Sequence, residues 1–330
     1  MTSPGFAIVG CGLIGTKRAV QLPAGAVKAV FDVKVQAAEA LAATLAGAEV
    51  AKSYEEVLVN RGVEVVVIST VHSALAPLTK QAMLAGRHVL VEKPAGLSLA
   101  EVRDLRRVEQ QTGVKVRVGF NHRYHPALLE AQRLLRSGAL GELMFVRGRY
   151  GHGGRVGYDK EWRADVARSG GGVLIDLGVH LVDLAGVFLG PFTRVEGHVT
   201  TSFWDMPVED NAFVSLETAR GQTAWLHVSC TEWKNLFSLE IYGRRAKLHL
   251  EGLGGSYGVE RLACYTMRPE MGPPETVISE YPRGDDSWRL EMEAFVRDLA
   301  EGRTPEPGLR EAEAAMQVVD TLYRRAASRD

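Results

Sequence analysis

Short apolar runs alternate with helical segments over the first 120 residues, and this alternation limits the fold more than any other feature of the sequence. The apolar runs cover residues 6–9, 27–31, 63–69, 88–91 and 114–119. Near-continuous runs of this length are typical of strands that are buried on both faces, as in parallel sheets. The helical segments cover residues 36–45, 53–60, 76–85 and 98–112. Repeated strand–helix–strand units with short links predict a doubly wound α/β domain.

A glycine-rich turn follows the first predicted strand. Its sequence, Gly10-Cys11-Gly12-Leu13-Ile14-Gly15, fits the pattern G-x-G-x-x-G and leads into a segment that can be helical. In this pattern the first two glycines let the backbone approach a pyrophosphate, and the third allows close packing of helix on sheet. Asp32 ends the second strand, where a carboxylate accepts hydrogen bonds from an adenosine ribose. Together these features predict a dinucleotide site, and a purely structural turn is the alternative.

The sequence pattern changes near residue 122. Beyond it, alternating apolar and polar residues between 194 and 251 predict antiparallel strands with one covered face. Residues 253–286, rich in Gly and Pro, are expected to be irregular. Further elements are expected at residues 126–137, 174–189, 287–301 and 309–327 (helices) and 143–150 (strand). We therefore predict a dinucleotide-binding domain at 1–122 and a second α/β domain at 123–330, whose terminal helices could pack back on the first.

Composition argues against several classes of partner. The net charge of −1 gives no electrostatic reason to expect nucleic acid or an anionic membrane surface. No apolar run is expected to reach the roughly 18 residues that span a bilayer. The three cysteines are too few and too scattered for a disulfide framework or a thiolate zinc site. The histidines His122, His125 and His152 lack an accompanying acidic ligand set, so no metal is expected. These observations predict a cytoplasmic protein.

The tripeptide Glu92-Lys93-Pro94 follows the predicted strand at residues 88–91. Ligands of a doubly wound sheet bind beyond the carboxyl ends of its strands, so this tripeptide is expected at the mouth of the site. Pro94 fixes its own φ and excludes Lys93 from the α region. The alternative is a strand-ending turn with an exposed lysine.

A second candidate constellation lies in the helix predicted at 174–189. Asp176 and His180 are four residues apart, so they share one helical face among apolar neighbours. A partly buried histidine beside a carboxylate is the usual form of an oriented proton acceptor near neutral pH. The alternative is a structural contact that satisfies a core histidine. Asp183, one turn further along, could equally be a charge that faces solvent.

These motifs, together with Asn121-His122-Arg123, resemble those of the Gfo/Idh/MocA oxidoreductases, the glucose-fructose oxidoreductase and inositol dehydrogenase group. The resemblance runs over nearly the whole chain in the order and spacing of the family. It implies an N-terminal Rossmann domain and a C-terminal α/β domain built on a large, open, mostly antiparallel sheet. In the family this sheet commonly forms the subunit interface, so a homodimer or homotetramer is expected.

The resemblance also implies roles for individual residues. Lys93 matches a lysine near the reacting hydroxyl and the nicotinamide ribose, and Asp176 and His180 match the pair that completes the catalytic triad. In this triad His180 is the proton acceptor and Asp176 orients the substrate or the imidazole. The residues expected at the cofactor are Gly10, Gly12, Leu13, Ile14, Gly15, Asp32, Thr70, His72, Glu92, Lys93, Asn121, Trp162 and Arg163. The residues expected at the substrate are Lys93, Arg123, Tyr158, Arg163, Asp176 and His180.

The chain departs from the family at one position. Members often read T-P-N-x-x-H after the third strand, whereas this chain reads Thr70-Val71-His72-Ser73-Ala74-Leu75. Leu75 stands in place of the histidine, and His72 is the candidate to replace its cofactor contact.

The expected function is an NAD-dependent dehydrogenase of a sugar, cyclitol, sugar acid or nucleotide-sugar. NAD is expected rather than NADP because Asp32 would repel a 2′-phosphate, although Lys34 could soften that repulsion. Basic residues at 151–160, with Arg123 nearby, suit an anionic group on the substrate, and a loop of solvated charges is the equal alternative. Two other functions remain open, a glycoside hydrolase that oxidises its sugar transiently with NAD and a non-catalytic NAD-binding sensor.

Overall fold

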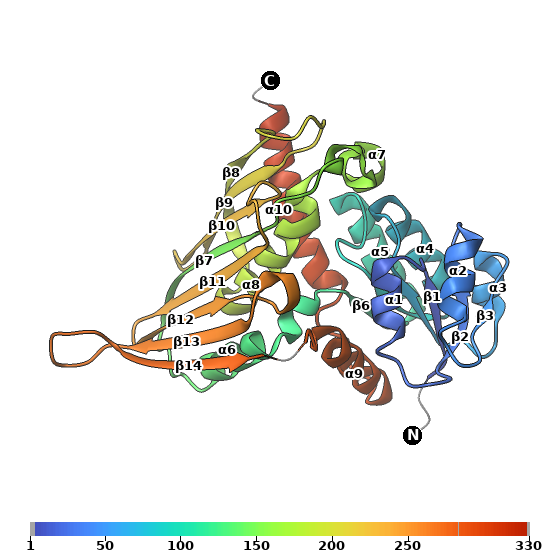
Figure 1. Ribbon diagram of the computed structural model, residues 1–330, viewed down its shortest axis with the longest axis horizontal. Helices are drawn as coiled ribbons and strands as arrows, with labels where there is room; N and C mark the ends of the chain where they lie inside the picture. The colour runs from blue at the N-terminus through green and yellow to red at the C-terminus, as the bar shows by residue number, and fades with distance from the viewer. Residues whose placement is uncertain (1–3, 283, 329–330) are drawn as a thin grey trace. The chain divides into compact units, whose positions relative to one another are not determined.

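The chain divides into two units in the computed structural model, which describes residues 4–282 and 284–328. Unit 1 comprises Met1–Phe120 and Trp288–Glu313, and unit 2 comprises Asn121–Ser287 and Ala314–Asp330 (Figure 1). The division near residue 120 lies two residues from the boundary expected at 122. The segment Trp288–Glu313 belongs to unit 1 because its residues Met292 and Phe295 are buried in the hydrophobic core of that unit.

Unit 1 is a parallel sheet with the strand order β3-β2-β1-β4-β5-β6. This order, with β1 and β4 buried along their whole length, confirms the predicted doubly wound domain. The strands are β1 Phe6–Val9, β2 Val27–Phe31, β3 Glu49–Val50, β4 Val65–Ile68, β5 His88–Val91 and β6 Val116–Val118. The helices are α1 Leu13–Ala19, α2 Val35–Ala42, α3 Tyr54–Val59, α4 His72–Leu84, α5 Leu99–Thr112 and α9 Ser287–Ala300. The order reverses between β1 and β4, and sheets of this kind bind ligands at such a switch point.

A local sequence signal accounts for the start of α5 in unit 1. At α5 the Ser98 side chain accepts a hydrogen bond from the Glu101 N–H at 3.2 Å, and the Glu101 carboxylate accepts one from the Leu97 N–H at 2.7 Å. Helix α4 begins at His72, four residues before its predicted start. Leu75 is fully buried in α4, so the residue in place of the family's histidine packs in the core.

Unit 2 is built on an eight-stranded sheet with the order β14-β13-β12-β11-β7-β10-β9-β8. Only β7 and β10 pair in parallel, which confirms the expected mostly antiparallel sheet. The strands are β7 Leu143–Gly151, β8 Phe192–Thr200, β9 Asn211–Thr218, β10 Thr223–Ser229, β11 Leu236–Gly243, β12 Ala246–Glu251, β13 Glu260–Thr266 and β14 Glu275–Tyr281.

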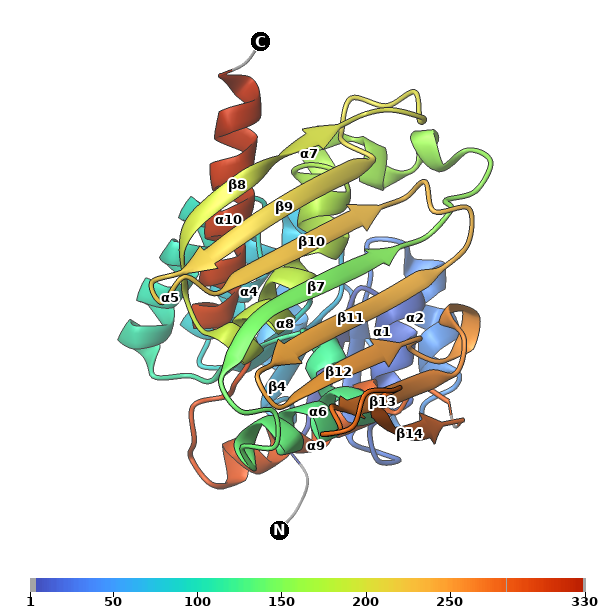
Figure 2. The same cartoon turned by 90° about the vertical axis from the view of Figure 1, so that its left-hand side faces the viewer.

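The helices of unit 2 lie on one face of this sheet, as Figures 1 and 2 show for α6, α8 and α10. The α-helices are α6 Pro126–Arg136, α7 Val166–Ser169, α8 Val179–Leu189 and α10 Leu309–Ala327, which belongs to this unit from Ala314 on. A π-helical turn, Leu174–Gly178, runs directly into α8. Short 3₁₀ helices cover Asn121–Tyr124, Tyr158–Lys160, Trp162–Ala164 and Gly255–Tyr257.

Two expectations from the sequence are wrong. Residues 253–286 are not irregular, because they contain β13 and β14, which pair with each other along their length. Strand β14 ends the sheet and most of its side chains are exposed, so its sequence lacks the apolar alternation of a covered strand.

The second error concerns apolar length. The stretch Val166–Leu189, with a mean hydropathy of 1.9, is by length and composition apolar enough to cross a membrane. However, 89% of its most apolar window is buried inside the structure, as in the core helix of a soluble protein.

Candidate active site

The glycine turn after β1 has the geometry that a pyrophosphate needs. Gly10 has a φ of +90°, and a Cβ at Gly15 would overlap the carbonyl oxygen of Gly10, so both positions require glycine. A Cβ on Gly12 would meet nothing within 4 Å, which leaves open space beside the start of α1. No side chain caps this helix, and its first residue, Leu13, is exposed. A dinucleotide therefore fits this turn.

Asp32 is hydrogen-bonded to the same turn. Its two carboxylate oxygens accept hydrogen bonds from the backbone N–H groups of Cys11 and Lys34, each at 2.8 Å. Carboxylate oxygens accept more than one hydrogen bond each, so Asp32 retains capacity for a ribose. Burial and the nearby Asp32 charge raise the pKa of the Cys11 thiol to about 12, so this cysteine stays protonated at neutral pH.

The turn after β4 carries Thr70, expected at the cofactor, and His72, the candidate to replace the contact of the family's histidine. The Thr70 hydroxyl donates a hydrogen bond to the carbonyl of Val71 at 3.2 Å, and His72 is buried at the first position of α4. Both residues follow a strand at the switch point of the sheet, where a ligand is expected.

Glu92, expected at the cofactor, has a different partner in unit 1. Its Oε1 accepts hydrogen bonds from Arg18 Nε at 2.9 Å and from Arg18 Nη2 at 2.7 Å. Arg18 is fully buried in α1, also pairs with Glu291 of α9, and lies under the Trp288 ring at 4.5 Å. Glu92 thus connects the end of β5 to α1 within unit 1. Lys93, the next residue, is half-buried, and the Lys93–Pro94 peptide bond is cis.

Asp176 and His180 are both buried in unit 2, with exposed fractions of 7% and 4%. Asp176 lies in the π-helical turn and His180 in the first turn of α8. Arg163 Nε donates a hydrogen bond to Asp176 Oδ2 at 2.9 Å, and its guanidinium lies over the Trp162 ring at 4.6 Å. Burial alone would lower the pKa of Arg163, but the Asp176 carboxylate holds it above its usual value. Arg163, which the sequence also placed among the site candidates, therefore contacts Asp176 of the predicted pair and stacks on Trp162.

Two aromatic rings, those of His122 and Tyr150, lie beside His180. Neither was among the site residues expected from the sequence. The His122 ring centroid is 3.8 Å from that of His180, and the Tyr150 ring lies edge-on to His180 at 6.2 Å. Tyr150 is hydrogen-bonded to Tyr257, and burial raises its pKa well above the usual value, so its hydroxyl keeps its proton. The sequence indicated His122 only as the middle residue of the Asn121-His122-Arg123 motif, and Tyr150 only as the last residue of a predicted strand.

Two residues of the Asn121-His122-Arg123 motif have partners within unit 2. Arg123 donates to both carboxylate oxygens of Asp183, at 2.7 and 2.6 Å. Asp183 is buried, so the interpretation of this residue as a solvent-facing charge is wrong. Asn121 Nδ2 donates to Ser287 Oγ at 2.8 Å. The side chains expected to contact cofactor and substrate thus also hold the fold of the unit together.

The loop after β7 contains one buried and one exposed candidate. Tyr158 is buried, with its ring 5.3 Å from His152 and 5.5 Å from Trp204. Arg155 is exposed and pairs with Glu161 at 2.7 Å. Within the residues that the structure describes, no group of three or more His, Cys, Asp or Glu side chains is placed to hold a metal ion.

Two family models match the chain and together span more than half of it. Residues 5–120 match the model of an oxidoreductase family with an NAD-binding Rossmann fold. Residues 128–249 match the model of the Gfo/Idh/MocA C-terminal domain.

Curated relatives and a solved structure cover almost the full length. The scyllo-inositol 2-dehydrogenase (NAD(+)) of Bacillus subtilis (strain 168) is 27% identical and covers 91% of this chain and 87% of its own. The D-xylose 1-dehydrogenase (NADP(+)) 2 of Haloferax volcanii is 28% identical, with 97% of each chain covered. The crystal structure of GenD2 from gentamicin A biosynthesis in complex with NAD has a TM-score of 0.84 and 28% identity, and covers 100% of this chain and 96% of that one.

Proposed function

This chain belongs to the Gfo/Idh/MocA family of NAD-binding oxidoreductases, and from that premise we propose that it oxidises a secondary hydroxyl of a small carbohydrate. The substrate class is a sugar, cyclitol or sugar derivative, and the reaction is reversible. Relatives named as inositol and xylose dehydrogenases support this class. The single observation that carries the proposal is the buried Asp176, which pairs with the partly exposed Arg163, with the buried His180 four residues further along.

We assign one chemical role to each residue of the triad. His180 accepts the hydroxyl proton, because a buried imidazole can take a proton near neutral pH. Asp176, held by Arg163, orients the substrate or the imidazole. The Lys93 ammonium stabilises the negative charge that develops on the substrate oxygen as its proton leaves. When bound, NAD supplies the acceptor for the hydride.

The cofactor is assigned to the glycine turn and Asp32. The backbone at Gly10, Gly12 and Gly15 would hold the pyrophosphate, and the Asp32 carboxylate would accept hydrogen bonds from the ribose. Thr70, His72, Lys93 and Asn121 remain candidates for the nicotinamide end.

The charge balance of unit 2 favours a neutral polyol over an anionic substrate. Each arginine expected to attract a carboxylate or phosphate already has an acidic partner: Arg123 has Asp183, Arg155 has Glu161 and Arg163 has Asp176. An anionic substrate would therefore meet arginines that are already neutralised. Free sugars and inositols thus rank before sugar acids and nucleotide-sugars.

We also infer that the open face of the large sheet is covered by a second copy of this chain. Trp225 is 67% exposed on this face, beside the stacked rings of Phe213 and His227, whose centroids are 4.4 Å apart. The rings of His198 and Phe213 are stacked at 5.0 Å and extend this aromatic row toward β8. Aromatic side chains in a row of this kind are typical of interfaces and are costly to leave in water.

A substrate screen tests the proposal. The purified chain is mixed with NAD and a panel of free sugars, inositols, sugar acids and nucleotide-sugars, and NADH absorbance is followed with analysis of the carbon product. The expected result is NADH formation with a neutral sugar or cyclitol and a keto or lactone product. The proposed function would be contradicted if no member of the panel gave NADH and no corresponding oxidised compound consumed it.

A further inference from the structure

The helix that carries Asp176 and His180 is capped by a carboxylate from another element. Glu209, two residues before the start of β9, accepts a hydrogen bond from the Gly172 N–H through Oε2 and one from the Leu174 N–H through Oε1, both at 2.9 Å. The backbone oxygen of Glu209 accepts a third from the Val173 N–H at 3.1 Å. The N–H groups of a first helical turn have no partner within the helix. Glu209 therefore binds three consecutive N–H groups, and the Tyr323 side chain also has backbone hydrogen bonds at Gly172 and Ile175.

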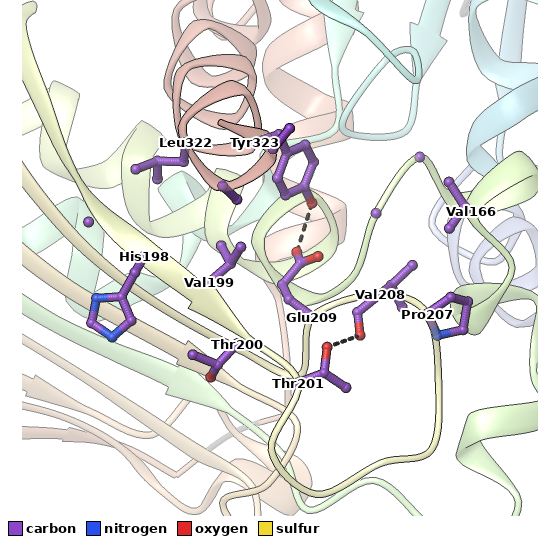
Figure 3. Close-up of a pocket in the computed structure, with 15 residues that line it drawn as sticks. Val166, His198, Val199, Thr200, Thr201, Pro207, Val208, Glu209, Leu322 and Tyr323 are labelled. Atoms are coloured by element: carbon purple, nitrogen blue, oxygen red, sulfur yellow. Dashed lines mark hydrogen bonds between the residues drawn. The ribbon is translucent and has the colours of Figure 1, made fainter. Parts of the chain in front are cut away.

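Tyr323 of α10 holds this carboxylate in turn. Its hydroxyl donates a hydrogen bond to Glu209 Oε1 at 2.7 Å, as Figure 3 shows. The glycines allow the close approach: a Cβ at Gly172 would overlap the backbone of Glu209, and one at Gly171 would overlap the Tyr323 hydroxyl. Gly171 and Gly172 are therefore the place where Glu209 and Tyr323 meet the start of the helix.

Glu209 and Tyr323 are connected to Asp176 through hydrogen bonds of the backbone at Gly172. The Asp176 N–H donates to the carbonyl of Gly172 at 3.2 Å, and the Gly172 N–H is bound by Glu209. Glu209 and Tyr323 also line a pocket of about 660 Å³ beside β8 and α10 (Figure 3), and none of the predicted site residues lines it. The two residues therefore reach Asp176 through the backbone and do not share its surroundings.

We propose that Glu209 and Tyr323 are positioning residues that fix the π-helical turn and hence the placement of Asp176 and His180 during proton transfer. This inference rests on the proposed function. The physical reason is that a reacting group displaced by roughly 1 Å loses about 10²-fold in rate, even when the change lies far from the chemistry. A buried carboxylate that binds two N–H groups and a hydroxyl leaves the turn little freedom to shift.

The test uses three variants and one control. Glu209→Gln keeps the shape of the side chain but turns an NH2 group toward a backbone N–H, and Tyr323→Phe removes only the hydroxyl. The third variant combines both changes. Tyr54→Phe is the control, because it deletes a buried hydroxyl whose hydrogen bond to the Leu78 carbonyl is also 2.7 Å long, in unit 1. Tyr323→Phe is the milder change and serves if Glu209→Gln fails to fold.

The readouts are kcat and KM for the substrate found in the screen, the NADH dissociation constant, and amide hydrogen exchange of residues 172–176. Tyr323→Phe should lower kcat roughly 10-fold and Glu209→Gln roughly 10²-fold, with KM changed by only about twofold. NADH binding should be unchanged, and exchange at 172–176 should accelerate in both. The double variant should lose less than the sum of the two single effects, because Tyr323 and Glu209 hold the same turn and are hydrogen-bonded to each other. Tyr54→Phe should keep the kcat of the unsubstituted chain.

Three results would overturn the inference. One is a kcat that is unchanged in the folded Glu209 and Tyr323 variants while their unfolding temperature falls, because that is the signature of a purely structural cap. Another is an exchange rate at 172–176 that does not change. The third is a kcat loss that is equal in Tyr54→Phe. Absence of hydride transfer in the unsubstituted chain is a different result, since it refutes the proposed function and the role assigned here with it.

Discussion

His180 is nearly fully buried, and its ring packs against His122 and lies edge-on to Tyr150. Tyr150 retains its proton because burial raises its pKa, so it can donate a hydrogen bond but cannot act as the base. We propose an imidazole as the proton acceptor, and His180 is the one on the predicted motif.

Replacing His180 with Asn tests this assignment. Asparagine keeps the size and hydrogen bonding of the site but removes the base, so turnover should fall by roughly 10²–10⁴, the usual contribution of a positioned general base. Lys93→Met should be comparably damaging. Both variants should still bind NADH, measured by fluorescence titration, because Asp32 and the glycine turn are unchanged. Near-full turnover in the folded His180→Asn variant would assign the proton acceptor to another residue.

We propose that Asp32 decides between NAD and NADP. Its carboxylate is held by two backbone N–H groups, so it cannot turn away from a 2′-phosphate without losing them. We expect a higher kcat/KM with NAD than with NADP, and Asp32→Ser should narrow the difference. The exposed Lys34, two residues further on, opposes this expectation because its positive charge would reduce the repulsion of a 2′-phosphate. Equal or higher efficiency of the unsubstituted chain with NADP would contradict the role of Asp32.

The sequence supplied candidate site residues, but it could not predict most of their partners. Asp176 and His180 could be paired from spacing alone, because both lie on one short helical stretch. Glu92, Arg123 and Asn121 could not be assigned in this way, since their partners Arg18, Asp183 and Ser287 lie 74, 60 and 166 residues away. Only the folded chain brings these groups together, and each pairing changes what the side chain can offer a ligand.

Among the elements, those with a strong apolar period were predicted and those without it were not. The central strands of unit 1 and α10 follow their expected ranges closely because burial imposes the pattern on the sequence. Strand β14 is exposed and carries no such pattern. Glu209, which binds the first residue of the π-helical turn Leu174–Gly178, lies 35 residues from it in the chain, so no local sequence signal predicts the turn.

One element-scale prediction concerns Arg18, which joins α1, the end of β5 and α9 through Glu92 and Glu291. Arg18→Met would leave two buried carboxylates without their cation, so the free energy of unfolding should fall by about 3–5 kcal/mol. Arg155→Met is the matched control, because its pair with Glu161 is largely exposed and should contribute less than about 1 kcal/mol. Urea denaturation measures both. An equal, small loss in the two variants would show that the buried network contributes no more than a surface pair.

For the whole molecule, the aromatic row on the open sheet predicts an oligomer. Trp225→Glu would place a charge at the centre of the proposed interface, so it should shift the mass in solution at micromolar concentration toward the monomer. Met271→Glu is the control, because Met271 is fully exposed at the tip of the β13–β14 hairpin, away from this row. Light scattering with size-exclusion chromatography measures both. A monomeric mass for the unsubstituted chain would contradict the proposed interface.

The central claim is that this chain transfers a hydride from a carbohydrate hydroxyl to NAD, and the stoichiometry of that reaction tests it most directly. With the substrate found in the screen, NADH and oxidised product should form in a one-to-one ratio, because each hydride that leaves the substrate carbon reduces one cofactor. Deuterium at the reacting carbon should appear in the NADH. Release of an alcohol or a glycan without net NADH would contradict the account, because it indicates transient oxidation within a hydrolase.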